Sequence, residues 1–247
     1  MLSSLAIKGY IIALLKVFYV AVGAEIITRL PITNILAVLG MLAIIAGALF
    51  ALAQDELKRR LAFSTVSQVG YIFLGIGLGN IQGLTGSFMH ILSHAITKAL
   101  LFLAAGSIIK RTGKTRISEM AGVGFEMPVT LGVFAVGSLS MIGIPLFSGF
   151  VSKWQLLLGS LARGNYLSVI VLVGGSLLAA AYLLPVLRTA FFERPVQNPV
   201  VTEMAYVQLV AMLFLAVVIL MVGVSPGVVL QLAKQAAMTL LGLEVLP

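Results

Sequence analysis

The sequence predicts an all-α membrane protein that forms a single integral-membrane helical domain over residues 1–247. Sixty per cent of the residues are hydrophobic and only 10% are charged, whereas soluble domains carry about 25% charged residues. The mean hydropathy is +1.14, and a soluble fold of this length has too little interior to cover so much apolar surface. The apolar residues also gather in stretches of about 20, the length that a helix needs to cross a bilayer.

Seven such stretches are expected to span the membrane. They run over residues 3–24, 33–53, 61–79, 84–109, 128–160, 166–190 and 202–223. The first lacks the charged start, short apolar run and small-residue site of a secretory signal, so we expect it to stay in the mature protein. Residues 226–243 carry two glutamines and Lys234, which favours an interfacial C-terminal helix over an eighth span.

The fifth stretch is too long for one straight crossing and is predicted to be a discontinuous helix. Its middle contains Gly143, Pro145, Ser148 and Gly149. Proline removes a backbone donor and clashes with the preceding turn, so a helix breaks there. A break at bilayer depth is tolerated only where protein or a water-filled cavity satisfies the freed backbone groups. The break near Pro145 therefore marks an interior, hydrated site.

Basic residues exceed acidic ones, with 16 lysines and arginines against 8 aspartates and glutamates and a formal charge of +8. In a membrane protein such an excess reports loop orientation, so nucleic acid is not expected as a partner. If the spans alternate, the loops at 55–60 and 110–116 and the turn with Arg188 and Arg194 hold nine basic residues on one side, against three on the other. The positive-inside rule then predicts a cytoplasmic N-terminus and an external C-terminus.

A row of protonatable groups lies in the fourth stretch, which reads FMHILSHAITKALLF from Phe88 to Phe102. His90, His94 and Lys98, here called the polar row, are spaced so that a helix places them on one face over about 12 Å of rise. An ionisable group at bilayer depth costs several kcal/mol unless it faces a cavity or a partner, so each is a functional candidate. Together they predict part of a path for protons.

Three further lysines are candidates for the same path. Lys8 lies in the first apolar stretch, and Lys153 follows the predicted break. Lys58 precedes the third stretch and is either part of the path or an ordinary cytoplasmic anchor, like its neighbours Arg59 and Arg60. The sequence alone leaves both interpretations of Lys58 open.

Two other interpretations of the histidines also stay open. A single buried histidine is often a hydrogen-bonded core residue, and His90 and His94 have the i, i+4 spacing of a zinc-binding pair. However, no third histidine accompanies them, a lysine continues the row, and the chain has no cysteine. We therefore expect no metal and no cofactor in this chain.

The most specific part of the sequence lies between residues 54 and 157. It contains QDELKRRLAFSTVSQVGYIFLGIGLGN, HILSHAITKALLFLAAGSII and MPVTLGVFAVGSLSMIGIPLFSGFVSKWQLL. These segments resemble the antiporter-like membrane subunits shared by respiratory complex I, multisubunit cation/proton antiporters and membrane-bound energy-converting hydrogenases. The opening SSLAIKGYIIALLK is similar to the eighth helix of that family.

The resemblance implies both a fold and residue roles. Members have fourteen spans with two inverted five-helix repeats, each with one broken helix bearing a lysine, and this chain is similar to one repeat plus flanking helices, namely helices eight to fourteen. Lys8 then resembles the lysine at the hinge between half-channels, and Lys58 the lysine on the central polar axis. The polar row resembles that of helix eleven, and Lys153 the terminal carrier of the outward half-channel.

This chain departs from the family in one respect. Nothing in it corresponds to the family's helices one to seven, which carry a buried glutamate and a buried lysine. We therefore expect a split, proton-translocating half-channel subunit of a redox-driven or antiport complex, of the cation/proton antiporter or membrane-bound hydrogenase type. It would lie in a prokaryotic cell membrane beside other membrane subunits, one of which supplies the missing N-terminal half. The chain itself would not be redox-active, and any redox cofactor would belong to partner subunits. The alternatives are a Na⁺-translocating subunit of such a complex and a structural subunit that transports nothing.

Overall fold

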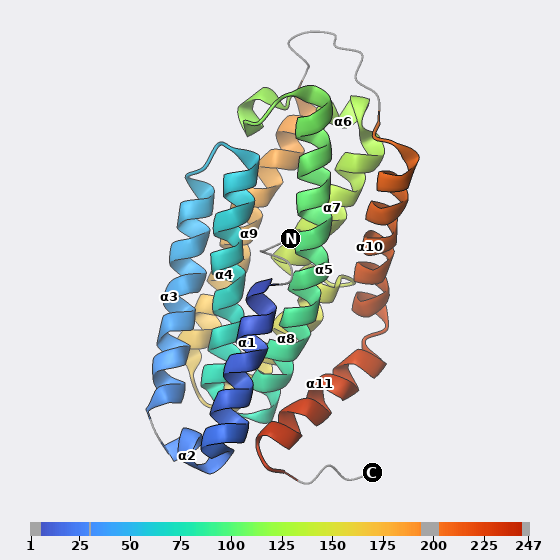
Figure 1. Ribbon diagram of the computed structural model, residues 1–247. Coiled ribbons are helices and arrows are strands. Elements are labelled where there is room, and N and C mark those ends of the chain that lie inside the picture. Colours follow the sequence, from blue (N-terminus) through green and yellow to red (C-terminus); the bar gives the residue numbers. More distant parts are fainter. Residues whose placement is uncertain (1–5, 30, 194–202, 244–247) are drawn as a thin grey trace.

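The protein is seen in a computed structural model that describes residues 6–29, 31–193 and 203–243. These residues fold into a bundle of helices (Figure 1). In chain order they are α1 (Ile7–Lys16), a π-helical continuation (Val17–Gly23), α2 (Ala24–Arg29), α3 (Ile32–Leu52), α4 (Leu57–Leu78), α5 (Ile81–Thr112), a 3-10 turn (Ile117–Glu119), α6 (Val123–Glu126), α7 (Pro128–Ile142), α8 (Ser148–Ala162), α9 (Tyr166–Phe192), α10 (Tyr206–Val224) and α11 (Gly227–Leu240).

The predicted class of an all-α membrane protein is confirmed. Among the described residues, six helical runs are long and apolar enough to cross a bilayer: the run from α1 into α2, and helices α3, α4, α5, α9 and α10. These six correspond to six of the seven stretches expected from the sequence. The seventh, residues 128–160, is divided between α7 and α8. The protein is therefore an integral membrane protein.

The discontinuous helix is present where the sequence predicted it. Helix α7 ends at Ile142 and α8 begins at Ser148, so Pro145 lies in the connection between them. Gly143 ends α7 with φ of +92°, and Leu146 also has a positive φ, of +78°. Only glycine adopts such angles without a steric penalty, which explains the glycine at the end of α7.

Local sequence signals set where the functional helices begin and end. The side chain of Asn80 caps α5 by accepting a hydrogen bond from the backbone N–H of Gly83 at 2.8 Å, and Gly113 ends α5 in the left-handed conformation. Helix α7 begins with Pro128, a residue favoured at a first helical position. The Glu203 carboxylate then accepts hydrogen bonds from two backbone N–H groups in the first turn of α7.

Helices α3 and α4 approach each other at backbone distance. A Cβ atom added to Gly47 would lie 2.4 Å from the backbone nitrogen of Ser67, and one added to Gly77 would lie 2.3 Å from that of Ala37. Gly40 and Gly70 meet the opposite helix in the same way. Small residues at such contacts let membrane helices pack closely. The two helices therefore form the tightest pair in the described bundle.

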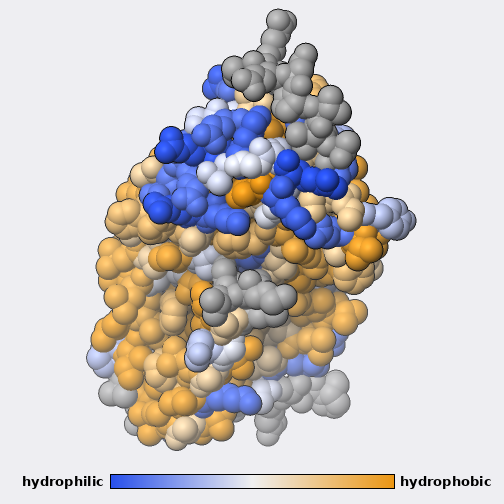
Figure 2. Space-filling model, turned by 45° about the horizontal axis from the view of Figure 1, so that its top comes forward, coloured by the Kyte–Doolittle hydropathy of each residue, from blue (hydrophilic) through white to orange (hydrophobic). Residues whose placement is uncertain are grey.

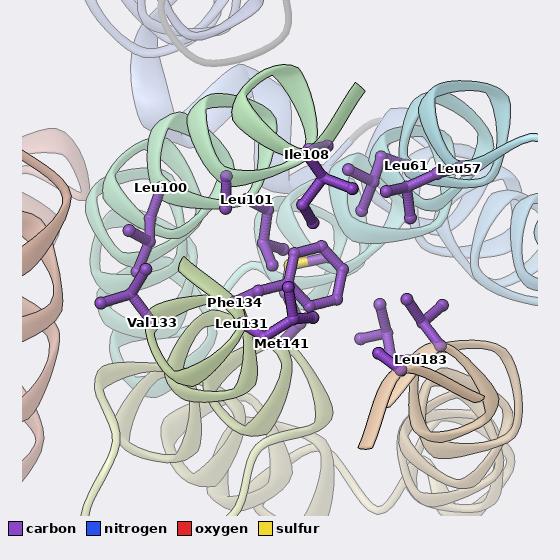
Figure 3. Packing of buried hydrophobic residues seen from close by; sticks show 14 of the residues in the cluster. Leu57, Leu61, Leu100, Leu101, Ile108, Leu131, Val133, Phe134, Met141 and Leu183 are labelled. Atoms are coloured by element: carbon purple, nitrogen blue, oxygen red, sulfur yellow. The ribbon is translucent and has the colours of Figure 1, made fainter. Parts of the chain in front are cut away.

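The apolar core lies between α4, α5, α7 and α9. Figure 3 shows Leu61, Leu101, Phe134 and Leu183 pointing into a common interior from these four helices. All four side chains are buried. This packing holds α5, which carries the polar row, against the broken helix.

The loops after α3 and α5 meet at one end of the bundle. The backbone N–H of Leu57 donates to the carbonyl of Thr115 at 3.0 Å, and that of Ile117 donates to the carbonyl of Asp55 at 2.8 Å. Figure 2 shows hydrophilic residues gathered at this end and hydrophobic residues over the sides. The loops at 55–60 and 110–116 thus share one end, as predicted, while the cytoplasmic location of that end stays a prediction. Arg194 lies outside the described residues.

Helix α11 covers most of the segment expected to be an interfacial helix. It packs against α5 and lies obliquely at the end of the bundle opposite the basic loops (Figure 1). Its interfacial location stays a prediction.

Candidate functional site

The polar row on α5 lies inside the bundle. His90 and His94 are each 2% exposed, and Lys98 is fully buried. The two imidazole rings are stacked, with their centres 6.0 Å apart and their planes within 8° of parallel. The three side chains therefore form a continuous row on one helix face, enclosed by the neighbouring helices.

Lys98 is held by α4. Its Nζ donates hydrogen bonds to the backbone carbonyl of Leu61 at 2.6 Å and to Oγ of Ser64 at 2.5 Å. The amine also lies 5.7 Å from the centre of the Phe102 ring. An amine in an apolar interior needs polar acceptors, so these two oxygens hold the amine of Lys98 in place. Lys98 is the end of the polar row on the side of the basic loops.

The histidines have few protein partners. Nδ1 of His90 shares a hydrogen bond with Oγ of Ser152 on α8 at 2.8 Å. Nε2 of His90 and both ring nitrogens of His94 are buried without a hydrogen-bond partner among the described residues. Buried polar atoms that protein does not satisfy normally bind ordered water. The environment of His94 thus fits a hydrated passage.

Hydroxyl groups join the broken helix to α5. Oγ atoms of Ser93 on α5 and Ser148 on α8 are 2.8 Å apart, and Ser140 on α7 lies 3.3 Å from Ser148. Thr97 contacts Ser140 at 3.2 Å. A Cβ atom on Gly149 would lie 1.8 Å from the carbonyl oxygen of Ser140, so glycine is required where α8 passes the end of α7. The backbone N–H of Gly149 also donates to Oγ of Ser140 at 3.2 Å, so a side chain satisfies part of the backbone at the break.

Lys153 reaches back from α8 to the end of α7. Its Nζ donates to the carbonyls of Met141 at 2.8 Å and Ile142 at 3.0 Å, and to Oγ of Ser176 on α9 at 3.0 Å. The last carbonyls of a helix carry the negative end of its dipole, so they stabilise a cation. Gly143 leaves room for this arrangement, because a Cβ there would lie 2.9 Å from Cδ of Lys153.

Lys8 approaches the polar row from α1. Helix α1 packs against α4 and α5 and begins part-way along the bundle (Figure 1), and Lys8 in its first turn is buried. Its positive charge acts on His90, His94 and Lys98, and the charge of Lys153 also acts on His90. The structure thus brings Lys8, the polar row and Lys153 into one electrostatically coupled set.

Lys58 is not part of this set. It is exposed in the first turn of α4, at the end with the basic loops, as the anchor interpretation requires. Arg60 is buried instead, and its guanidinium donates to the carbonyls of Gln54, at 2.8 and 2.5 Å, and Tyr182, at 3.0 Å. A role for Lys58 on a central polar axis stays a prediction.

Metal ligation has no further support in the residues that the structure describes. Within them, no group of three or more histidine, cysteine, aspartate or glutamate side chains comes close enough to hold an ion. Nδ1 of His90 faces a serine hydroxyl, and within the described part of the chain neither histidine has a carboxylate partner of the kind that commonly orients a metal-bound imidazole.

Residues 1–179 match the family of transmembrane subunits described as NADH:quinone oxidoreductase/Mrp antiporter. The chain belongs to this family. The resemblance seen in the sequence is therefore confirmed. NADH-quinone oxidoreductase subunit N of Desulforudis audaxviator is 45% identical over 166 residues, which make up 66% of this chain and 33% of that protein.

Individual chains in solved structures of membrane complexes have the same fold. A chain of the membrane-bound sulfane sulfur reductase, an archaeal respiratory membrane complex, matches 98% of this chain with a TM-score of 0.88 and 28% identity, over 48% of its own length. A chain of the Mrp complex from Dietzia sp. DQ12-45-1b matches 88% of this chain with a TM-score of 0.80 and 26% identity, over 51% of its length. This antiporter-family chain thus spans about a third to a half of the relatives it matches.

Sequence reasoning missed a second polar stripe in this antiporter-family chain, on α4. Arg60, Ser64, Gln68 and Tyr71 recur at helical spacing and are all buried. Both amide atoms of Gln68 lack a hydrogen-bond partner among the described residues, and the Tyr182 hydroxyl lies beside Gln68 and Ser64. The helical spacing of these four residues within an apolar stretch was the signal that could have revealed the stripe. That spacing includes Arg60 but excludes Lys58.

Proposed function

We propose that this chain is the outward proton half-channel of an antiporter-like subunit within a larger membrane complex. The observation that carries the proposal is the coupled, buried set of protonatable groups from Lys8 through the polar row to Lys153. Such groups inside a membrane protein mark ion pathways, because burying them costs free energy that packing alone would avoid.

In the proposed path, Lys8 receives a proton from the other half of the subunit. Lys98, His94 and His90 pass it along α5 with the help of water, and Lys153 releases it on the far side. Amines and imidazoles can both bind and release protons, whereas a guanidinium group stays protonated. We propose that the end with the basic loops faces the cytoplasm of a prokaryotic cell, so that the path runs outward.

Lys153 is suited to be the terminal carrier because its acceptors adjoin the helix break. Two of its acceptors, Met141 and Ile142, are the last carbonyls of α7, directly before the break. A change at the connection of residues 143–147 would move these carbonyls relative to α8. Loss of that contact would free the amine to give up its proton.

The test compares Lys153→Arg and Lys153→Ala with the unchanged protein in ion-pumping membranes that contain the complete complex. We expect both variants to abolish proton transport, because arginine keeps the charge but does not release its proton. Lys234→Arg, at an exposed position on α11, is the matched control and should pump normally. Wild-type pumping by both Lys153 variants would contradict the carrier role and favour a structural subunit.

Protons are preferred over Na⁺ as the transported ion. The buried charged side chains among the described residues are Lys8, Arg60, Lys98 and Lys153, which are all basic. A hard cation such as Na⁺ needs oxygen ligands and is repelled by such an interior. Uptake of radioactive Na⁺ by vesicles under conditions that abolish the proton gradient would support the alternative instead.

We further propose that a separate chain supplies the remaining half of the subunit. The chain would then belong to a complex of the cation/proton antiporter or membrane-bound hydrogenase type, although the 45% identical relative carries a complex I name. Purification from native membranes tests both points. Co-purification of this chain with a separate multi-span chain is expected, and one polypeptide that carries both halves would contradict the split. The identity of co-purifying redox or antiporter subunits would settle the type of complex.

A further inference from the structure

One aromatic residue contacts both His90 and Lys153. Tyr71 on α4 is fully buried, and its ring centre lies 5.3 Å from that of His90, with the two planes tilted by 31°. The Nζ atom of Lys153 lies over the same ring, 4.6 Å from its centre. Tyr71 is not a member of the proposed proton path, yet it contacts the last two members of that path.

The position of Tyr71 is fixed by α9. Its hydroxyl donates to the carbonyl of Leu172 at 3.4 Å and lies beside Ser176, the side chain that also accepts from Lys153. A Cβ atom on Gly175 would lie 2.5 Å from this hydroxyl, so glycine is needed there to admit the phenol. The hydroxyl thus lies against α9, and the face of the buried ring is what meets the amine of Lys153.

Oxygen acceptors and an aromatic ring face surround the amine of Lys153. An ammonium group has three N–H donors, and those of Lys153 meet the carbonyls of Met141 and Ile142 and the hydroxyl of Ser176. The face of the Tyr71 ring covers the same amine. The negative face of an aromatic ring attracts a cation but gives little attraction to a neutral amine.

We propose that Tyr71 is a charge-dependent latch on Lys153. Its ring holds the lysine in place while the amine is protonated and loosens it once the proton has left, so that the neutral amine can swing toward its next proton donor. The inference rests on the proposed function of Lys153 as the terminal carrier. Tyr71 is a positioning residue, and its hydroxyl takes no part in proton transfer.

The experiment varies the electronic character of the ring at constant shape. Tyr71 is replaced by phenylalanine, by pentafluorophenylalanine, whose ring is similar in size but has a reversed quadrupole, and by leucine. In the purified complete complex, acylation of Lys153 by a membrane-permeant amine reagent is followed by mass spectrometry. Proton transport is measured in parallel on the same variants.

We expect Tyr71→Phe to match the unchanged protein in both measurements, because it keeps the attractive ring face. The pentafluorinated ring and Tyr71→Leu should raise the rate of Lys153 acylation about tenfold, as expected for the loss of a buried cation–π contact, and should slow transport. Equal acylation with the phenyl and pentafluorophenyl rings would overturn the latch. A phenylalanine variant that behaves like leucine would also overturn it, since the hydroxyl would then be responsible.

The acylation measurement separates this inference from the proposed function, because it needs no transport. Transport that survives in both Lys153 variants refutes the carrier role, whatever the labelling shows. Transport that is lost in those variants but unchanged with the pentafluorinated ring refutes only the latch. The pentafluorinated side chain also keeps the packing volume. If Tyr71→Leu misfolds, the comparison between the phenyl and pentafluorophenyl rings still decides the question.

Discussion

Gly143→Ala, compared with a control variant, should separate the effect of backbone strain on stability from the effect of the position of Lys153 on transport. Gly143 has φ of +92°, and an L-residue forced into the left-handed region costs about 1–2 kcal/mol. The new Cβ would also lie 2.9 Å from Cδ of Lys153. The lysine side chain is flexible and can shift, but the shift moves its amine away from the carbonyls at the end of α7.

Gly23→Ala supplies the matched control. Gly23 has nearly the same backbone angle, φ of +97°, but nothing lies within 4 Å of a Cβ built there. Both variants should therefore lose about 1–2 kcal/mol of folding stability. Only Gly143→Ala should also slow proton transport, because only there does the added methyl group reach the carrier lysine.

Two measurements on the purified complete complex decide the outcome. The first is the midpoint of chemical denaturation, followed by circular dichroism, and the second is the initial rate of proton pumping in reconstituted vesicles. Equal pumping by the two alanine variants would refute the reasoning about Lys153. Unchanged stability of both would refute the reasoning about the backbone.

Two other comparisons each pair a buried basic residue with an exposed one. Arg60→Ala should cost about 2–4 kcal/mol of stability, because it leaves backbone carbonyls without their charged donor. Arg59→Ala should change stability by no more than about 0.5 kcal/mol, since the exposed ion pair of Arg59 with Glu56 contributes little, and denaturation of the purified complex measures both. Lys98→Met should stop proton pumping in reconstituted vesicles, while the exposed Lys58→Met should pump normally; equal rates would contradict the distinction between the two lysines, and loss of pumping in Lys58→Met alone would place Lys58 rather than Lys98 on the path.

Much of the site could be predicted from the sequence because its signals are local. The polar row depends only on a spacing of four residues within one helix, and the break depends on Gly143 and Pro145 within one apolar stretch. Both features are present in the fold, because a helix is the only structure available to a single apolar stretch that crosses the membrane.

The contacts across helices could not be predicted in this way. Lys58 and Arg60 are two residues apart and therefore point to different faces of α4, but nothing in that turn says which face is buried. The partners of Lys153 are main-chain carbonyls of α7, which no side-chain pattern reveals. Tyr71 reads as an ordinary apolar residue until α8 and α9 are placed around it.

The backbone contact between α3 and α4 has a mechanical consequence. Helices whose glycines touch the opposite main chain cannot slide or rotate without collision, so the pair serves as a rigid wall. Tyr71 and the acceptors of Lys98 belong to that wall, while Lys153 and the carbonyls that hold it lie on either side of the helix break. The proposed proton path would need a stationary side against which the other side can move, and the small residues of α3 and α4 would supply it.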